Sequence, residues 1–346
     1  MTDLSRKNFL RFLAASMGSL YLSGCINQEK LLSKSLSPNK ITPTSFLLGP
    51  QNTVEGDPTA EPDEFPTQEP SVSPNPIYPD LVAARQGDPE EMVRAAVDSL
   101  GGMGRFVKPG DVVVVKPNIC ASYHSYEYAA TTNPWVVGAV VKMALESGAK
   151  QVKVMDFPFG GTAEQAYRNS GIQAEVSKAG GKMVVMSNIK FIETSIPDGK
   201  DMKSARIYDD VLRADVLINI PIAKHHELAR LTLAMKNLMG VIYNRPYMHA
   251  NLGQRLADLS TRIRSNLVVV DAVRMLMAHG PTGGNLADVK KADTIIASPD
   301  IVAADSYAAN LFGVQPENLG YIKKGVQMGL GVKNLSKLNI KEINLG

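Results

Sequence analysis

The chain has 346 residues, of which 44% are hydrophobic and 21% charged, enough to bury the core of one large domain or two ordinary ones. Its 37 basic residues nearly balance its 34 acidic residues, which excludes the strongly basic surface that binds nucleic acid. Two cysteines exclude a disulfide framework, a cysteine-based zinc site and an iron–sulfur cluster held by cysteines.

Residues 1–24 have the pattern of a signal peptide. A basic stretch at residues 6–11 precedes an apolar stretch at residues 12–22, which is too short to cross a bilayer as a helix. The stretch ends in Leu-Ser-Gly-Cys at residues 22–25, which matches the lipobox of bacterial lipoproteins. We therefore expect lipidation at Cys25, and an exported protein anchored at the outer face of the cytoplasmic membrane or in the periplasm. Lys7 stands where a twin-arginine signal has its second arginine, so the signal is twin-arginine-like and the general secretory route stays open.

Residues 25–76 are rich in proline, serine and threonine. Ten of the 21 prolines fall between residues 38 and 79, and large apolar residues are few. Such a segment cannot offset its ordering entropy by burial, which predicts a disordered tether between membrane and domain. The alternative is a long arm packed on the domain, with Phe46 near its docking point.

Residues 77–346 alternate β-branched runs with amphipathic stretches. Several runs are apolar at every position, as in strands covered on both faces, which predicts a single α/β domain with a mostly parallel sheet and helices on both faces. Candidate strands are 81–85, 112–115, 152–155, 183–186, 216–220, 267–270, 294–297 and 340–345. Candidate helices are 89–100, 134–146, 162–179, 228–239, 249–264, 301–312 and 318–329.

Polar residues follow five of these strands. In open α/β sheets, ligands bind beyond the carboxyl ends of the strands, so we expect these side chains to converge there. The alternative is that each is polar only because the chain reaches the surface. The five positions are Lys116 with Asn118, Asp156, Lys224 with His225 and His226, Asp271, and Asp300.

The ligand-binding residues predicted from these motifs are cations, amides and a glycine-rich turn. Lys116 and Asn118 suit a carboxylate or phosphate oxygen. Backbone N–H groups around Gly280, Thr282 and Gly283 would cradle an anion, unless the turn is only a flexible connector. Asn237 adds a further amide.

The predicted catalytic residues are Lys224, His225, Lys236 and Asp271. Lys236 lies in an apolar stretch, where it either reaches the surface or points into the site with a lowered pKa that suits a base. A histidine with Asp271 would form an acid/base pair. The lone thiol of Cys120 matches no recognisable nucleophile motif.

Metal binding is the other role open to the histidines. A mononuclear divalent metal would be held by one of His225 and His226, in the first place His226, together with His249 or His279 and an aspartate such as Asp271, which gives nitrogen and oxygen ligands. The five histidines show no fixed metal-ligand spacing, and the alternative is contact with substrate or solvent.

Residues from about 81 to 331 resemble the prokaryotic domain of unknown function 362. The resemblance rests on ordered matches that include residues 113–118, 131–134, 221–226, 234–240, 270–271, 280–284 and 298–305. Members described as iron–sulfur proteins carry an appended Cys-x-x-Cys-x-x-Cys segment, which this chain lacks, so the resemblance implies the core domain and no cluster. It implies no established reaction.

Two functions fit these observations. The first is an enzyme of unknown reaction whose crevice binds a small anionic or phosphorylated ligand. The second is a non-catalytic solute-binding or assembly subunit with a protein partner in the cell envelope. An enzyme would show shifted pKa values in the crevice, and an assembly subunit a large exposed apolar patch.

Overall fold

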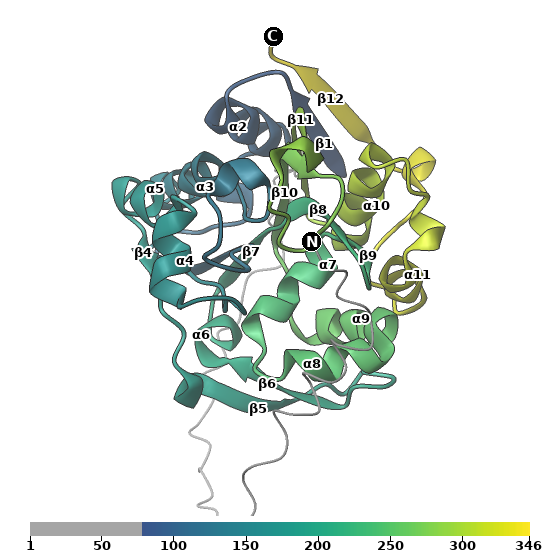
Figure 1. Cartoon of the computed structure of the whole chain (residues 1–346). Helices are drawn as coiled ribbons and strands as arrows, with labels where there is room; N and C mark the ends of the chain where they lie inside the picture. The colour runs from purple at the N-terminus through teal and green to yellow at the C-terminus, as the bar shows by residue number, and fades with distance from the viewer. Residues whose placement is uncertain (1–77) are drawn as a thin grey trace, which may run out of the picture. The chain divides into compact units, whose positions relative to one another are not determined.

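A computed structural model describes residues 78–346 of the chain (Figure 1). The predictions for the signal peptide at 1–24, for lipidation at Cys25 and for the tether at 25–76 lie outside the described residues. Within the part of the chain that is described, no helix is long and apolar enough to cross a membrane.

Residues 78–346 form an α/β fold built on one large sheet. Its strands are β1 (Leu81–Arg85), β2 (Val112–Pro117), β3 (Gln151–Val154), β4 (Lys182–Met183), β7 (Val216–Ile220), β8 (Ile222–His226), β9 (Arg230–Thr232), β10 (Leu267–Leu276), β11 (Val289–Ser298) and β12 (Ile340–Asn344). The α-helices are α2 (Pro89–Ser99), α3 (Pro134–Glu146), α4 (Ala163–Asn169), α5 (Ile172–Lys178), α6 (Asp209–Leu212), α7 (Ala234–Asn237), α8 (Arg245–Met248), α9 (Leu252–Arg262), α10 (Ile301–Leu311) and α11 (Gly320–Gln327).

The sheet is mostly parallel, as its continuous apolar strands predict. Its order is β12-β1-β11-β10-β7-β2-β3-β4, with β8 and β9 joined to β10 off this path. The central pairs β10-β7, β7-β2 and β2-β3 are parallel, as are β3-β4, β10-β8 and β1-β12. Strand β11 is antiparallel to both of its neighbours, and β9 is antiparallel to β8.

Helices cover both faces of the sheet, because successive strand residues point to opposite sides. Val113 and Val115 pack in one core with α2, α3 and α5, whereas Val114 packs in a second core with α7, α9, α10 and α11. Figure 1 shows α3 and α5 on one side of the central strands and α10 and α11 on the other. The predicted fold class is confirmed.

Several local elements differ from the expectation, among them β8, which was not a candidate strand. The stretch 162–179 is two helices, α4 and α5, because Gly171 has a positive φ of 78° between them. The stretch 228–239 contains strand β9 and only the short helix α7. A two-stranded hairpin, β5 (Phe191–Ser195) with β6 (Ser204–Tyr208), was not predicted and packs on the second core.

The direction of β11 corrects the prediction that five strand ends converge. Ser298, at the carboxyl end of β11, pairs with Val268 near the start of β10, so Asp300 lies at the opposite edge from the carboxyl ends of the parallel strands. There Asp300 caps helix α10 by accepting hydrogen bonds from the backbone N–H groups of Val302 and Ala303, both at 2.8 Å.

Candidate functional site

A buried polar cluster lies where β2, β3 and β8 end, and helix α7 completes it. We call this the cationic cluster and define it by the residues at the end of this paragraph. Several of them are nearly fully buried, which is rare for lysine and needs a physical explanation. The cluster comprises Lys116, Asn118, Cys120, Asp156, Asn219, Lys224, His226, Lys236, Asn237 and Arg245.

The first cation, Lys116, is neutralised by Asp156. Its Nζ lies 2.8 Å from Asp156 Oδ1, and the exposed fractions of the two side chains are 1% and 4%. Burial lowers the pKa of Lys116, and the negative charge of Asp156 opposes that shift. Asp156 also accepts hydrogen bonds from the backbone N–H groups of Ile119 and Phe157, so the pair is held in place.

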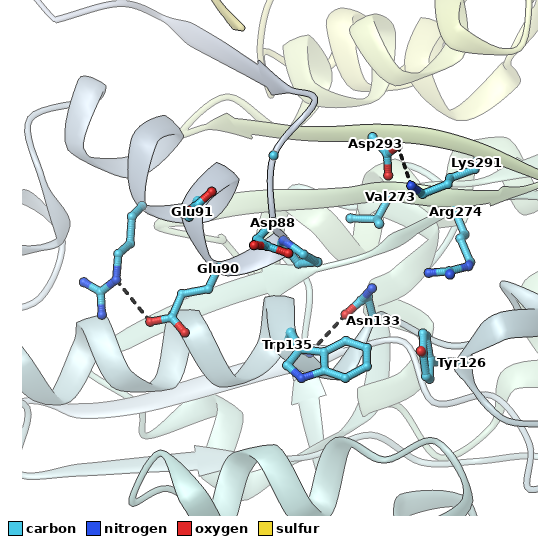
Figure 2. Close-up of a pocket in the computed structure, with 13 residues that line it drawn as sticks. Asp88, Glu90, Glu91, Tyr126, Asn133, Trp135, Val273, Arg274, Lys291 and Asp293 are labelled. Atoms are coloured by element: carbon cyan, nitrogen blue, oxygen red, sulfur yellow. Dashed lines mark hydrogen bonds and ion pairs between the residues drawn. The ribbon is translucent and has the colours of Figure 1, made fainter. Parts of the chain in front are cut away.

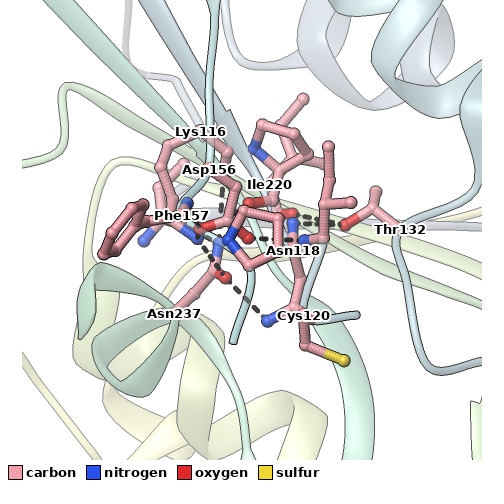
Figure 3. A network of polar contacts seen from close by, with 12 residues as sticks. Lys116, Asn118, Cys120, Thr132, Asp156, Phe157, Ile220 and Asn237 are labelled. Carbon is pink, nitrogen blue, oxygen red and sulfur yellow. Dashed lines mark hydrogen bonds and ion pairs between the residues drawn. The ribbon is translucent and has the colours of Figure 1, made fainter. Parts of the chain in front are cut away.

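Three asparagines connect this ion pair to the rest of the cluster, and Figure 3 shows two of them, Asn118 and Asn237. Asn237 Oδ1 accepts hydrogen bonds from Lys116 Nζ at 2.8 Å and from Asn118 Nδ2 at 2.9 Å. Asn237 Nδ2 donates to Asn219 Oδ1 at 2.8 Å, and Asn219 Nδ2 donates to the backbone carbonyl of Ala234. This network fixes short helix α7, which carries Asn237 and Lys236.

The second cation, Lys224, has no carboxylate partner in the part of the chain that the structure describes. Its Nζ donates to the carbonyl oxygens of Ala130 at 2.7 Å and Pro281 at 2.9 Å, and to Asn118 Oδ1 at 3.0 Å. Cys120 Sγ lies 3.3 Å from the same nitrogen. The ammonium is therefore well solvated by protein dipoles, but its charge is not neutralised.

The third cation, Lys236, is the least satisfied. Among the described residues its Nζ contacts only one acceptor, Met239 Sδ at 3.9 Å. Burial, followed by the positive charge of Lys224, lowers the pKa of Lys236 to about 7. Its exposed fraction is 9%, against 1% for Lys116 and Lys224, so it is the most accessible lysine of the cluster.

A fourth cation, Arg245, closes one side of the cluster. Its guanidinium donates to the carbonyl oxygens of Phe157 and Pro158 and lies 5.0 Å from the centre of the Phe157 ring. Burial lowers its pKa, and Asp156 opposes that shift. Among residues 78–346, Lys224, Lys236 and Arg245 thus form no ion pair with a carboxylate, and Asp156 pairs with Lys116.

His225 and His226 occupy successive positions of β8 and have separate partners. His225 Nδ1 accepts from the backbone N–H of Gly280 at 3.2 Å. His226 Nδ1 accepts from the backbone N–H of Leu228 at 3.2 Å, which assigns its ring proton to Nε2. Burial and then the charge of Lys236 lower the pKa of His226 to about 3, so this ring is neutral at physiological pH.

The predicted metal ligands are not gathered into one group. His279 is exposed and its Nδ1 lies 2.7 Å from Asp288 Oδ2. Burial, and after it the charge of Lys236, lowers the pKa of His249, which places this residue near the cationic cluster. Among residues 78–346, no three His, Cys, Asp or Glu side chains form a group that could hold a metal ion.

The glycine-rich turn contributes a carbonyl to the cluster in place of the expected N–H groups. The Gly280 N–H binds His225 Nδ1, and the Gly283 N–H donates to the carbonyl of His279 at 3.1 Å. Both N–H groups therefore donate to acceptors within the protein, so the prediction that they bind an anion is wrong. The turn instead presents Pro281 O to Lys224, and the Thr282 hydroxyl forms no hydrogen bond with another described residue.

Asp271 has a structural role that the sequence did not indicate. Its two carboxylate oxygens accept hydrogen bonds from the backbone N–H groups of Asn133 at 2.7 Å and Val273 at 3.0 Å. Burial raises the pKa of Asp271 to about 6. The prediction that Asp271 forms an acid/base pair with a histidine is therefore wrong, because both of its carboxylate oxygens accept hydrogen bonds from backbone N–H groups.

Three residues of the site escaped the sequence analysis. Asn219 interrupts an apolar strand, and an isolated amide in a buried strand is a usable signal for a polar site. Gly240 is needed because a Cβ there would lie 1.9 Å from Asp156 Oδ1. Arg245 has no local signal, since it lies after the apolar stretch and only the tertiary fold brings it to Phe157.

Comparison with known proteins identifies relatives of this chain. It is 28% identical over 247 residues to a thylakoid-associated protein of Synechocystis, covering 69% of this chain and 74% of that protein. The lactate racemase apoprotein of Thermoanaerobacterium thermosaccharolyticum has a TM-score of 0.42 at 12% identity, covering 66% of this chain and 56% of the other. A Thermotoga maritima protein has a TM-score of 0.40 at 13% identity, covering 66% and 60%.

The two solved structures therefore match over less than two thirds of their own length, and a likeness at these scores says nothing about activity. The sequence profile of the domain of unknown function DUF362 matches residues 113–310, which is more than half of the chain. That range includes every residue of the cationic cluster. The chain belongs to the DUF362 family.

Proposed function

We propose that this protein is an exported, lipid-anchored enzyme that binds a small anionic or phosphorylated ligand at the cationic cluster. One observation supports the proposal above all: Lys224 and Lys236 are both buried, Arg245 is partly buried beside them, and none of the three forms an ion pair with a carboxylate of the described residues. A buried charge without a counter-charge costs several kcal/mol, so a site that keeps two such lysines next to an arginine is suited to an anion.

Lys236 is the residue best suited to act on the ligand. With a pKa of about 7, its amine exists in both protonation states near neutral pH, as a general acid or base requires. It also has no strong hydrogen bond to break within the described part of the chain. The ligand would be positioned by Lys224 and His225 of β8 and by the side-chain amides of Asn118 and Asn237. His226, whose ring is neutral, would donate a hydrogen bond through its Nε2–H.

The shifted pKa values favour an enzyme over the alternative, a non-catalytic solute-binding or assembly subunit. Strongly perturbed titratable groups concentrate at catalytic sites, and here the pKa values of Lys236 and His226 are both shifted by burial at one place. The relative named as thylakoid-associated is compatible with a membrane-associated location for this chain.

Ligand-induced stabilisation tests anion binding directly. Inorganic phosphate and succinate should raise the melting temperature of the full chain at about pH 6, and the effect should shrink above pH 7, where Lys236 loses its proton. Lys236→Met should lose most of the effect, whereas Lys323→Met, at an exposed lysine of α11, should keep it. Equal shifts for wild type and Lys236→Met at both pH values would exclude the assignment.

Native mass spectrometry with metal analysis, on protein purified from its own envelope, separates the two functions. A retained small molecule, or a stoichiometric metal held by His226, His249 or His279, would support the enzyme. An empty protein with a co-purifying partner would favour the assembly subunit. The lipid anchor is tested by labelled palmitate, which the wild type should incorporate and a Cys25→Ser variant should not.

A further inference from the structure

A pocket of about 660 Å³ lies away from the cationic cluster, with which it shares no residue. Its walls come from the start of α2, from residues 126–135 and from facing parts of β10 and β11 (Figure 2). This volume is typical of a site for a small organic molecule. The proposed function does not use it.

Asn133 supplies an unpartnered donor to this pocket. Its side-chain Oδ1 caps helix α3 by accepting from the Trp135 N–H at 3.0 Å, which fixes the orientation of the amide. Its Nδ2 is fully buried and has no hydrogen-bond partner among the described residues, although Asn133 is only 4% exposed. A buried amide donor without an acceptor is unfavourable, so a hydrogen bond to a ligand oxygen would be favourable here.

Two aromatic rings and an arginine stand beside this donor. The rings of Tyr126 and Trp135 lie 5.0 Å apart in an edge-to-face arrangement, and Trp135 is 40% exposed. The Arg274 guanidinium lies 5.4 Å from the centre of the Tyr126 ring and forms no ion pair within residues 78–346. This wall therefore combines two perpendicular aromatic rings with a positive charge that has no ion-pair partner among the described residues, next to Asn133 Nδ2.

The wall formed by α2 has the opposite charge. Glu90 is neutralised by Arg94 and Lys142, and Asp293 by Lys291. The carboxylates of Asp88 and Glu91, in contrast, form no ion pair with any described residue. Figure 2 shows these acids on the α2 side of the pocket and Arg274 with Tyr126 on the other.

We propose that this pocket binds a small aromatic zwitterion, a planar ring that carries both a carboxylate and an ammonium group. The ring packs on Trp135 and Tyr126. The carboxylate accepts hydrogen bonds from Arg274 and from Asn133 Nδ2, as charge-assisted contacts prefer. The ammonium group faces Asp88 and Glu91, so each unpaired group of the pocket gains a partner.

The single tryptophan of the chain is Trp135, so its fluorescence reports on the pocket directly. L-phenylalanine should quench or shift this emission in the full chain with saturable binding. Phenethylamine lacks the carboxylate, phenylpropionate lacks the ammonium group and leucine lacks the ring. Each should bind about tenfold more weakly or worse, since each leaves charged or apolar contacts unmade.

Asn133→Asp is the sharpest variant, because aspartate keeps the oxygen that caps α3, removes the amide donor and places a negative charge where the ligand's carboxylate would lie. It and Arg274→Met should each weaken phenylalanine binding about tenfold, whereas Arg264→Met, at an exposed arginine elsewhere, should not. Calorimetry confirms the affinities without relying on fluorescence. Absence of phenylalanine binding to the wild type, or equal affinity for phenylpropionate, would overturn the proposal.

Discussion

Lys116 and Asp156 form an ion pair of 2.8 Å in the interior of the protein, at the carboxyl ends of adjacent parallel strands. The pair contacts Asn237 on one side and the backbone of Ile119 on the other. Lys116 is therefore committed to Asp156, which corrects the expectation that it is a free ligand-binding cation. The variant Lys116→Ala would therefore measure the contribution of this ion pair to stability rather than the affinity for a ligand.

Removing the carboxylate should be strongly destabilising. Asp156→Ala leaves a buried ammonium without its counter-charge and the backbone N–H of Ile119 without its acceptor, while the N–H of Phe157 keeps only the carbonyl of Gly240. We expect a loss of about 3–5 kcal/mol in the free energy of unfolding, measured by urea denaturation. Asp98→Ala, at an exposed aspartate of α2, is the control and should change stability little. Similar losses for the two variants would show that the ion pair is not important for stability.

Gly240 should tolerate no side chain. A Cβ there would lie 1.9 Å from Asp156 Oδ1 and 2.5 Å from Lys116 Nζ, and neither atom can move without breaking the ion pair. Gly240→Ala should therefore cost at least about 1–3 kcal/mol. Gly104→Ala should be neutral, since a Cβ at Gly104 meets nothing within 4 Å. The melting temperatures of the two variants are compared with that of the wild type. An unchanged melting temperature for Gly240→Ala would contradict the prediction that a Cβ at this position clashes with the ion pair.

Lys236→Met should stabilise the protein in a pH-dependent way. In the folded state the pKa of Lys236 is about 7, below its ordinary value of 10.5, so folding is penalised while the lysine is charged. Between pH 7 and pH 10.5 the lysine is protonated in the unfolded chain but neutral in the folded protein. The loss of folding stability caused by Lys236 is therefore greatest below pH 7 and decreases as the pH rises toward 10.5.

The gain from Lys236→Met should thus be several kcal/mol at about pH 6 and much smaller at about pH 9.5. Urea denaturation at the two pH values measures it, with Lys323→Met as the exposed control. A gain that does not depend on pH would mean that the pKa of Lys236 is not lowered. The same variant should lose anion binding, so stability and function should change in opposite directions.

Asp271→Asn should show the opposite pH dependence to Lys236→Met. Burial raises the pKa of Asp271 to about 6 from 3.8, so its contribution to stability is complete below pH 3.8 and is lost as pH rises through 6. The cost of Asp271→Asn should therefore be larger at about pH 4 than at about pH 8. Urea denaturation of wild type and variant at both pH values gives this cost, and Asp98→Asn controls for an exposed carboxylate. A constant cost would contradict the raised pKa.

The strands on the main path of the large sheet and most of the longer helices could be predicted, because each depends on a local pattern, whereas β8 and β9 were not predicted. The run of four valines at 112–115 has no polar side to expose, so it had to be a strand covered on both faces. Proline in the first position with Asn133 as the cap marked the start of α3 correctly. Hairpin β5-β6 was missed because its burial pattern does not alternate regularly.

The sequence alone determined which residue types follow the strands, and so where polar chemistry would concentrate. It could not decide which charges cancel, because the desolvation of a lysine and the distance to its partner depend on segments remote in the chain. Lys116 meets Asp156 across parallel strands, whereas Lys236 lies on a short helix that is held by Asn237 and Asp305 and meets no carboxylate of residues 78–346. Tertiary packing therefore decided that one lysine is part of an ion pair and that the other is buried without a carboxylate partner in the described structure.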